Sequence, residues 1–412
     1  MERAVFTRTA AVALVAASAF YSLFLCWLFT KGLPVSNTVV ALADAAIVIC
    51  AAALVTFKRL DALLIVLCGL AANFLLISIF SQKLDFKSVR DAVAIVVFLA
   101  LGLTAGNASN AKRAFFIIAA GVAGFGLFEF FAPRFYVATF HILQFYIMRG
   151  VVDRSVGEWF DSSLFVSGLR GGSRNLLPIL GSHRVSSIFM EPVSMGNFGA
   201  IAVAWALSLS RRSWLTAVFA AAIGASAIVM ADARFAAIAT LLFFAARLAP
   251  LAWTRFILAL APLIAIGLLI WCSTALSPIG DDLPSRLSVS GAAIVSLTPL
   301  ELFGLSPGGP ATLDSGYAYA LTAFGLPLCL ALWTAFVLLP TNGAPAARFK
   351  LSIGCYICAL LCVSGSSLFA LKTGALLWFL LGSMMAEERA AARVTSHVGH
   401  IQTNAAPQAQ PA

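Results

Sequence analysis

Long apolar stretches limit what this chain can fold into more than any other feature. Residues 10–30 carry no charged side chain and are long enough to cross, as a helix, the ~30 Å hydrocarbon core of a bilayer. No water is available in lipid to bind backbone N–H and C=O groups, so such a stretch must be helical. The sequence therefore predicts an all-α polytopic membrane protein with about 12 transmembrane helices. The further stretches lie at 37–57, 61–80, 90–106, 113–132, 194–209, 214–231, 233–249, 253–276, 316–338, 349–364 and 366–386.

The composition supports this class and argues against two others. Hydrophobic residues make up 61% and charged residues 11% of the 412 positions, compared with roughly 45–50% and about 25% in soluble domains. All eight cysteines fall in apolar stretches, which predicts neither a disulfide framework nor a cysteine metal site. The net charge of +10 comes largely from small basic clusters between the stretches, a pattern typical of membrane topology rather than of nucleic-acid binding.

The short basic loops predict the orientation. No convincing cleavage site for a signal peptide follows residues 10–30, so we expect this stretch to remain as the first span. With a cytoplasmic N-terminus, every short cytoplasmic loop is basic, as the positive-inside rule requires. Both termini are then cytoplasmic. The same choice leaves four basic residues outside: Lys31, Lys83, Lys87 and Arg90.

Two long polar segments divide the predicted spans. The stretch Arg134–Met148 at the start of the first segment is too short to span, and its aromatic residues suit a helix lying on the membrane surface. The predicted parts are 1–132 with transmembrane helices 1–5, 133–193 as a large outer loop with an interfacial helix, 194–276 with helices 6–9, 277–315 as a second outer loop, 316–386 with helices 10–12, and 387–412 as a disordered cytoplasmic tail.

Arginines collect on the outer side, against the positive-inside trend. A guanidinium has a planar fork that suits phosphate oxygens and stays charged in a partly dry site, so the pattern predicts a site for a phosphate-bearing anion. Glycines around Arg170 and Arg174 would let backbone N–H groups turn toward the same anion. The alternative is that the arginines only reach lipid headgroups or pair with loop carboxylates. The arginines on this side are Arg134, Arg149, Arg154, Arg170, Arg174, Arg184, Arg234 and Arg286, and the last five of them are predicted to converge on the anion.

The last stretch of the first outer loop, Ser182–Pro192, is the candidate active site. Ionic side chains are costly where a loop enters an apolar helix, and Arg184 and Glu191 lie at this junction. Pro192 suits the first helical turn, which fixes Glu191 at the membrane surface. If both charged residues belong to one helix, they face the same side two turns apart. The alternative is that Glu191 only caps the helix or neutralises Arg184.

Charged residues inside the predicted spans are expected to be structural. Asp44, Glu129 and Lys372 are isolated at depths where a charge usually has a partner, and Asp44 with Lys372 is one such pair. On the second outer loop, Asp314 is expected to cap the tenth helix, with Tyr317 one turn further in.

Short patches of sequence, together with the number of spans and the large outer loop, resemble a known family. They are Arg184–Phe198, Asp232–Phe235, Leu302–Gly304 with Asp314–Tyr317, and Phe324–Leu326. In them the chain resembles the Wzy-type O-antigen and exopolysaccharide polymerases and the related O-antigen ligases. Ala233-Arg234 stands where many relatives have Ser-Arg, and Asp314-Ser315 stands where many ligases have a His-Asn pair. The second departure favours a polymerase over a ligase.

The resemblance implies a GT-C-related O-antigen polymerase/ligase architecture in a bacterial inner membrane, with both large loops in the periplasm. It implies glycosyl transfer, without metal or cofactor, from an undecaprenyl-diphosphate-linked oligosaccharide to a sugar hydroxyl. The five arginines and Tyr317 would bind the diphosphate or the rest of the substrate. Besides membrane lipids, a chain-length regulator is a partner that the sequence leaves open.

Catalytic roles follow from that reaction. A displacement at the anomeric carbon needs a group that takes the proton of the acceptor hydroxyl, and Glu191 is the predicted general base. His183 is expected to orient the acceptor, and His183 or Asp314 would be the base if Glu191 is not. The alternatives are an O-antigen ligase and, from another class, a transporter or flippase of a lipid-linked saccharide. Transporters usually carry charge near the midplane and often have duplicated halves, and the sequence shows neither.

Overall fold

A computed structural model describes residues 2–55, 61–82, 85–155, 164, 166–169, 176–277, 282–305, 315–365 and 367–404. Within these residues there is no strand, only an isolated bridge between Leu169 and His183. The long helices are α1 (Glu2–Thr30), α2 (Asn37–Leu54), α3 (Asp61–Ser81), α4 (Phe86–Ala105), α5 (Ala108–Phe131), α9 (Pro192–Ser208), α10 (Trp214–Met230), α11 (Arg234–Leu248), α12 (Thr254–Ala275), α15 (Gly316–Leu338), α16 (Ala344–Leu361) and α17 (Leu371–Asn404). Shorter helices include α6 (Pro133–Thr139), α7 (Ile142–Met148), α13 (Leu283–Val295), α14 (Pro299–Leu302), η4 (Ser187–Phe189) and η7 (Ser367–Phe369).

The chain is an all-helical, multi-pass membrane protein. Nine helices in its described part are long and apolar enough to cross a membrane: α1 to α5, α10, α12, α15 and α16. Helices α9, α11 and α17 coincide with the other three predicted spans, but α9 and α11 have only 17 and 15 residues. Helix α17 carries charged residues near its start and in its second half, and it continues to Asn404, beyond residue 386 where the last span was predicted to end.

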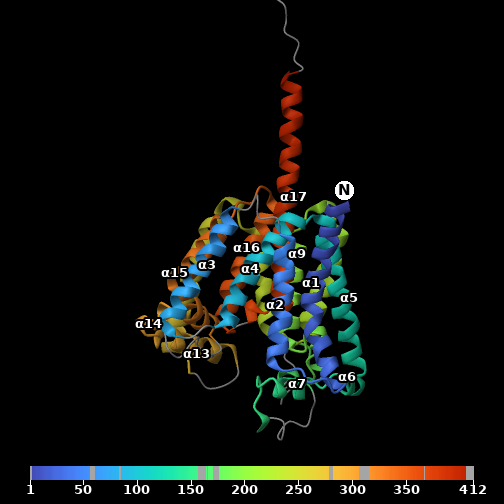
Figure 1. The fold of residues 1–412 in the computed structure, drawn as a ribbon, viewed down its shortest axis with the longest axis vertical. Coiled ribbons are helices and arrows are strands. Elements are labelled where there is room, and N and C mark those ends of the chain that lie inside the picture. The colour runs from blue at the N-terminus through green and yellow to red at the C-terminus, as the bar shows by residue number, and fades with distance from the viewer. Residues whose placement is uncertain are drawn as a thin grey trace, which may run out of the picture.

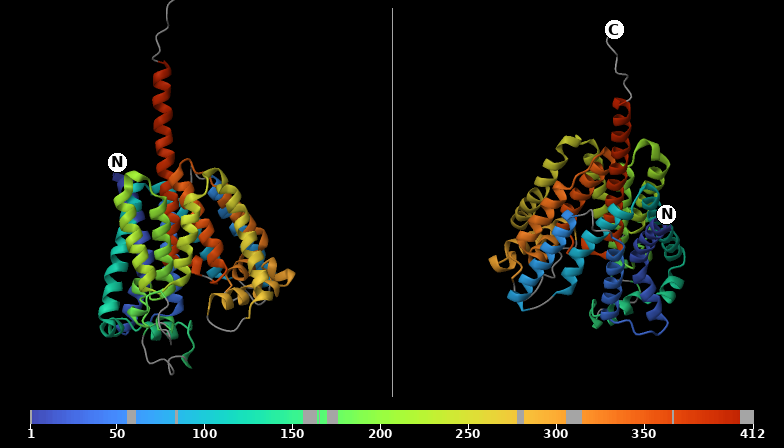
Figure 2. Two further views of the ribbon diagram at one scale, coloured as in Figure 1. Left: turned by 180° about the vertical axis from the view of Figure 1, so that it is seen from behind. Right: turned by 45° about the horizontal axis from the view of Figure 1, so that its top comes forward.

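The two polar segments lie at the same end of the bundle. Figure 1 shows the N-terminus and the far end of α17 at one end, and α6, α7, α13 and α14 at the opposite end. The two views of Figure 2 agree. We call the end with α6 and α7 the outer end, in keeping with the predicted orientation.

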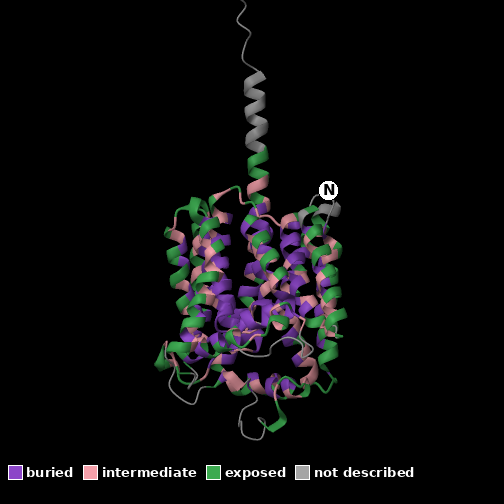
Figure 3. Cartoon of the chain, turned by 90° about the vertical axis from the view of Figure 1, so that its left-hand side faces the viewer, coloured by how far each residue is buried: buried purple, intermediate pink, exposed green. Residues whose placement is uncertain are grey.

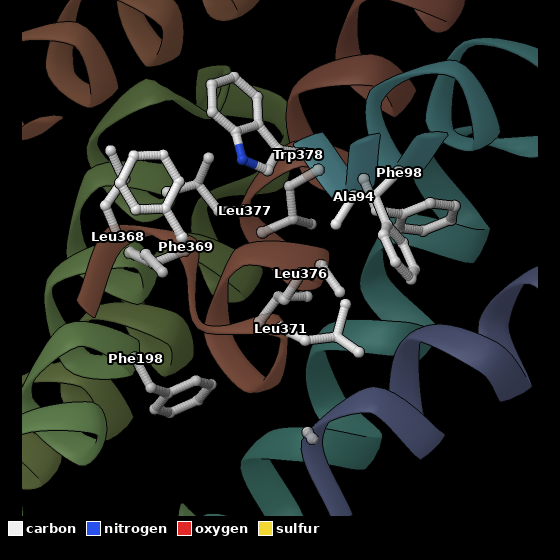
Figure 4. Close-up of a cluster of buried hydrophobic side chains, with 14 of the residues drawn as sticks. Ala94, Phe98, Phe198, Leu368, Phe369, Leu371, Leu376, Leu377 and Trp378 are labelled. Atoms are coloured by element: carbon white, nitrogen blue, oxygen red, sulfur yellow. The ribbon is translucent and has the colours of Figure 1, made fainter. Parts of the chain in front are cut away.

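Close packing between α4 and α17 forms the centre of the bundle. A Cβ atom on Gly102 would lie 2.5 Å from the Phe379 carbonyl oxygen, and one on Gly382 would lie 2.3 Å from the Leu99 carbonyl oxygen. Small residues allow such backbone approach in membranes, where lipid is as apolar as the helices themselves. Figure 4 shows apolar side chains of α4, η7 and α17 gathered around this contact, and in Figure 3 buried residues fill the interior while exposed ones cover the outside.

The predicted interfacial helix of the first outer loop is two helices, α6 and α7. They separate at His141, whose backbone N–H binds Thr30 Oγ1 at the end of α1 at 3.1 Å. Tyr136, Phe145 and Tyr146 are buried. Both helices therefore pack against the outer end of the bundle, which places the hydroxyls of the two tyrosines inside the protein.

Helix α15 is interrupted within its length. Gly325 has φ 75° and ψ 150°, and Pro327 follows it. Proline removes a backbone donor, and glycine adopts the left-handed region without a steric penalty, so the sequence accounts for the break. The Asn73 side chain of α3 donates to the Phe324 carbonyl at 3.0 Å, which stabilises the interrupted turn.

Candidate functional site

The first outer loop returns to the bundle as an irregular segment that ends at Glu191. Its last regular piece is the short helix η4, so Arg184 and Glu191 do not lie on one helix, and that conditional prediction is wrong. Ser187 and Met190, at the two ends of η4, have φ values of 52° and 61°. Non-glycine residues in this region carry strain of about 1–3 kcal/mol and persist only where the surroundings hold them.

Glu129 of α5 is one group that holds this segment. Its side chain is completely buried, and its Oε2 accepts the backbone N–H groups of Ser186 at 2.9 Å and Ser187 at 2.6 Å. The Ser186 hydroxyl donates to the same carboxylate, and His183 Nε2 lies 3.1 Å from Oε1. A buried charge is costly unless it is hydrogen-bonded, and here several donors converge on it. Glu129 thus has the structural partners expected at its depth.

Two further helices hold η4. The Tyr136 hydroxyl of α6 donates to the Ser187 carbonyl at 2.7 Å, and the Ser187 hydroxyl donates to the Val122 carbonyl of α5 at 2.8 Å. Lys372 Nζ of α17 donates to the Phe189 carbonyl at 3.0 Å. The segment before Glu191 is therefore fixed by α5, α6 and α17 together.

Glu191 is the N-cap residue of α9, and Pro192 begins the helix as predicted. Its carboxylate makes no capping hydrogen bond to the helix. Instead, the Tyr146 hydroxyl donates to Oε1 at 2.6 Å, Ser194 Oγ donates to Oε2 at 3.0 Å, and Lys372 Nζ lies 2.8 Å from Oε2. Its side chain remains 27% exposed. Its bonds are thus neither those of a cap nor those of a counter-ion for Arg184.

These partners keep the Glu191 carboxylate ionised. Burial on its own would raise the pKa of Glu191, but the charge and hydrogen bond of Lys372, with the hydroxyls of Tyr146 and Ser194, outweigh it and lower the pKa below its usual value. At neutral pH the site therefore holds a fixed, partly exposed carboxylate. Such a group can accept a proton or orient a hydroxyl.

Lys372 reaches this site because α17 begins only one residue earlier, after η7. The sequence-based pairing of Lys372 with Asp44 is wrong. Lys372 pairs with Glu191, and Asp44 pairs with Arg90 of α4. Asp44 and Glu191 both lie far from their partners in sequence. The packing of α2, α4, α9 and α17 therefore determines which ion pairs form.

A second polar network joins α2, α4 and α15. Arg90 binds Asp44 and Asp91, and the Tyr319 hydroxyl donates to Asp91 Oδ2 at 3.0 Å. Lys87 Nζ lies 3.3 Å from the Tyr319 hydroxyl and 4.5 Å from the centroid of its ring. Lys87 and Arg90 are two of the basic residues that the topology left unexplained on the outer side. Their place there and the isolated charge of Asp44 were the sequence features that pointed to this network.

Arg184 contacts the protein itself. It is buried, and its Nε donates to the Ala231 carbonyl at 2.9 Å while a terminal nitrogen donates to the Ser167 carbonyl at 3.0 Å. Arg234 begins α11 just after that same turn and is half-buried. The N-cap residue of α11 is Ala233. The structure therefore brings Arg184 and Arg234 to the same turn between α10 and α11.

The remaining predicted site residues are dispersed. Arg286 is exposed on α13, which packs against α12 and α15. The Tyr317 side chain is buried, and its hydroxyl donates to the Cys358 carbonyl of α16 at 3.3 Å. The N-cap residue of α15 is Ser315, whose side chain accepts the Ala318 N–H, so the prediction that Asp314 caps this helix is wrong. Arg170, Arg174 and Asp314 lie outside the described residues.

Among the residues that the structure describes, no group of three or more histidine, cysteine, aspartate or glutamate side chains is placed to hold a metal ion. No protein-family model, curated protein or solved structure matches the chain.

Proposed function

We propose that this protein is a polysaccharide polymerase that joins undecaprenyl-diphosphate-linked oligosaccharide repeat units by metal-independent glycosyl transfer. All twelve long helices span a bacterial inner membrane in this proposal, with both termini cytoplasmic and the outer end in the periplasm. The resemblance of the sequence patches to the Wzy-type polymerases supports the reaction class. The geometry around Glu191 supports the outer end of the bundle as the site of the reaction.

The observation that carries the proposal is the ionised carboxylate of Glu191 at the outer end. It is 27% exposed, whereas Glu129 of the same neighbourhood is fully buried. The strained segment before it is fixed by three helices, so the carboxylate is held in one position. A group that is charged, reachable and preorganised is what proton transfer from an incoming hydroxyl requires.

In the proposed reaction, Glu191 accepts the proton of the acceptor sugar hydroxyl. The acceptor oxygen forms a bond to the anomeric carbon of the donor, the bond from that carbon to the diphosphate oxygen breaks, and its electron pair leaves with the diphosphate. General-base help of this kind is typically worth roughly 10²–10⁴-fold in rate. Lys372 and Tyr146 position the carboxylate, and Lys372 compensates its charge before the proton arrives.

The other predicted residues take supporting roles in this proposal. His183, beside Glu129, is the second candidate to orient an acceptor hydroxyl, and Asp314 is a further candidate base. Arg234, with Arg170, Arg174, Arg184, Arg286 and Tyr317, belongs to the proposed substrate-binding set. Arg234 at the start of α11 is the best placed of the described ones, because it is half-buried and close to the returning loop.

A flippase of a lipid-linked saccharide is the second candidate. The observation that favours it is the break in α15 at Gly325, since interrupted membrane helices are common at transporter sites. A polymerase makes a new glycosidic bond, whereas a flippase only moves the lipid. An O-antigen ligase makes one bond to a different acceptor and leaves the number of repeat units unchanged.

Purified protein in liposomes with undecaprenyl-diphosphate-linked repeat units separates these functions. We expect carrier-linked chains of several repeat units without any added acceptor. Products that appear only when lipid A core is supplied would indicate a ligase, and transfer of the lipid between leaflets without new bonds would indicate a flippase. In a deletion strain, single repeat units should accumulate, and long carrier-linked chains there would contradict a polymerase.

A further inference from the structure

His183 lies where the first outer loop passes from the surface into the bundle. Ser182 before it is exposed, whereas Arg184 after it is buried. The backbone is fixed at this boundary, because Leu169 forms a bridge with His183 and the Arg184 N–H donates to the Gly168 carbonyl at 2.8 Å. The imidazole ring is therefore held in one place, with 21% of the side chain exposed.

The two ring nitrogens of His183 have different surroundings. Nε2 faces inward and lies 3.1 Å from Oε1 of Glu129, a side chain with no exposed surface. Nδ1 has no hydrogen-bond partner in the part of the chain that the structure describes. It is also not enclosed, as the unpartnered ring nitrogens of Trp205 and Trp378 are. The exposed part of the ring therefore includes a nitrogen that a group from outside can reach.

Glu129 determines which of these nitrogens carries the hydrogen. A carboxylate only accepts hydrogen bonds, and a neutral imidazole has one donor and one acceptor nitrogen. Oε2 of Glu129 accepts the backbone N–H groups of Ser186 and Ser187, which fixes the orientation of the carboxylate. Nε2 is then the donor to Oε1, because the bond that one ring nitrogen makes sets the tautomer. Nδ1 is left as an acceptor.

An acceptor nitrogen selects the kind of group that binds to it. A sugar hydroxyl has a hydrogen that Nδ1 can accept, whereas an ionised diphosphate offers only lone pairs. The guanidinium of Arg184, on the next residue, can only donate, and it donates to backbone carbonyls of the protein. His183 thus suits the saccharide part of a substrate and not its diphosphate.

We infer that Glu129 is a positioning residue for His183, and that Nδ1 of this ring accepts a hydrogen bond from a hydroxyl of the incoming saccharide. In the proposed reaction, Glu191 takes the proton of the reacting hydroxyl, and His183 orients the sugar without taking a proton. The inference rests on the proposed function only for the identity of the ligand. The tautomer is a property of the protein alone.

The position of the hydrogen is tested by ¹⁵N NMR of the full-length protein with labelled histidine. Spectra are recorded at about pH 8, above the ordinary imidazole pKa of about 6.5. Of the signals from the four histidines, the one that is lost in His183→Gln belongs to His183. We expect the hydrogen on Nε2. A ring with the hydrogen on Nδ1, or with one on each nitrogen, would overturn the inference.

Glu129→Gln tests the positioning role in the same spectra. The amide oxygen can keep the N–H groups of Ser186 and Ser187, so the NH2 group takes the place of Oε1 and faces Nε2 of His183. The hydrogen should therefore move to Nδ1. An unchanged tautomer in folded Glu129→Gln would show that Glu129 does not set it. The wild-type spectrum decides the tautomer even if this variant does not fold.

His183→Gln separates binding of a sugar from a structural role. The glutamine amide can still donate to Glu129 but has no group in the position of Nδ1. We expect an unfolding midpoint near that of the wild type and polymer formation at least tenfold lower. The matched control is His141→Gln, a half-buried histidine at the same end, which should keep both.

The two kinds of failure can be told apart. Wild-type polymer formation in folded His183→Gln would overturn the role of Nδ1 in binding the saccharide. A wild-type protein that makes no polymer would contradict the proposed function, whereas the tautomer measured by NMR would still support or refute the positioning by Glu129.

Discussion

Glu129 and Glu191 are two carboxylates that meet the same loop in opposite ways. Glu129 is fully buried and accepts backbone N–H groups of Ser186 and Ser187, whereas Glu191 is 27% exposed and is held only by side chains. Backbone donors fix the chain itself, so Glu129 determines the path of the loop. Side-chain donors fix only the carboxylate, so Glu191 can exchange one of them for a substrate hydroxyl. The difference separates a structural charge from a reactive one.

The largest expected effect is on activity, from Glu191→Gln. The amide keeps the size and hydrogen-bonding capacity of the side chain but removes its basicity, so polymer formation should fall roughly 10²–10⁴-fold. Polymer made from lipid-linked repeat units in liposomes measures this. The control is Glu301→Gln on α14 at the same end, where a glutamine keeps the capping box with Thr298. A wild-type rate in well-folded Glu191→Gln would place the base elsewhere.

The next effect is on stability, from Glu129→Gln. A glutamine carbonyl oxygen can still accept the N–H groups of Ser186 and Ser187, but these bonds lose the charge of the carboxylate, and the NH2 group takes the place of Oε1 beside His183 Nε2 and the Ser186 hydroxyl. Hydrogen bonds to a charged group are worth about 1.5–3 kcal/mol each, compared with about 0.5–1.5 kcal/mol for neutral ones. The midpoint of thermal unfolding in detergent should therefore fall clearly, and that of Glu191→Gln should change little. Equal midpoints for the two variants would remove the distinction between the carboxylates.

The pH dependence of activity tests whether Lys372 sets the ionisation of Glu191. Because the folded-state pKa of Glu191 is lowered, its contribution to stability is present above the unfolded value of about 4.3 and is lost only as the pH falls through the folded value. Activity should therefore not fall through this group between pH 7 and 5. In Lys372→Met, burial acts without the opposing charge, so the acid limb of the pH–rate profile should move to higher pH. An unmoved limb would show that Lys372 does not set the ionisation of the base.

The smallest effect is expected from Tyr146→Phe. This change removes one hydrogen bond to a charged group that is partly open to solvent, which we expect to cost about 1.5 kcal/mol, or roughly tenfold in rate. Rate and unfolding midpoint are measured together, with Tyr136→Phe as the matched control. Removing the Tyr136 hydroxyl, which binds the Ser187 carbonyl, should affect the midpoint more than the rate. The reverse pattern would exchange the roles of the two tyrosines.

The helices were predictable because their cause is local. Apolar stretches of sufficient length must be helical in lipid, and Pro192 marks the start of α9 in the sequence as it does in the structure. The interfacial helix was predicted as one piece, since nothing in its composition shows that the His141 backbone binds Thr30 of α1. The break in α15 has a sequence cause in Gly325 and Pro327, although the partner from Asn73 depends on packing.

The site was predictable only in part. Glu191 stood out because a charge at a helix entrance is costly, and the structure places it at that entrance. Its partner Lys372 follows it by well over a hundred residues, and the pairing depends on how α17 packs against the start of α9.

Lipid-linked repeat units must reach Glu191 from outside in the proposed reaction. The most direct test is therefore to determine which side of the membrane the outer end faces. Ile179 is 91% exposed in the first outer loop, and Ser210 is exposed between α9 and α10 at the other end. Each is replaced by cysteine, and intact cells are treated with a membrane-impermeant thiol reagent, with the wild type as background. We predict that Ile179→Cys reacts from outside and that Ser210→Cys reacts only after the membrane is opened. The opposite pattern would place Glu191 in the cytoplasm and contradict the proposed reaction.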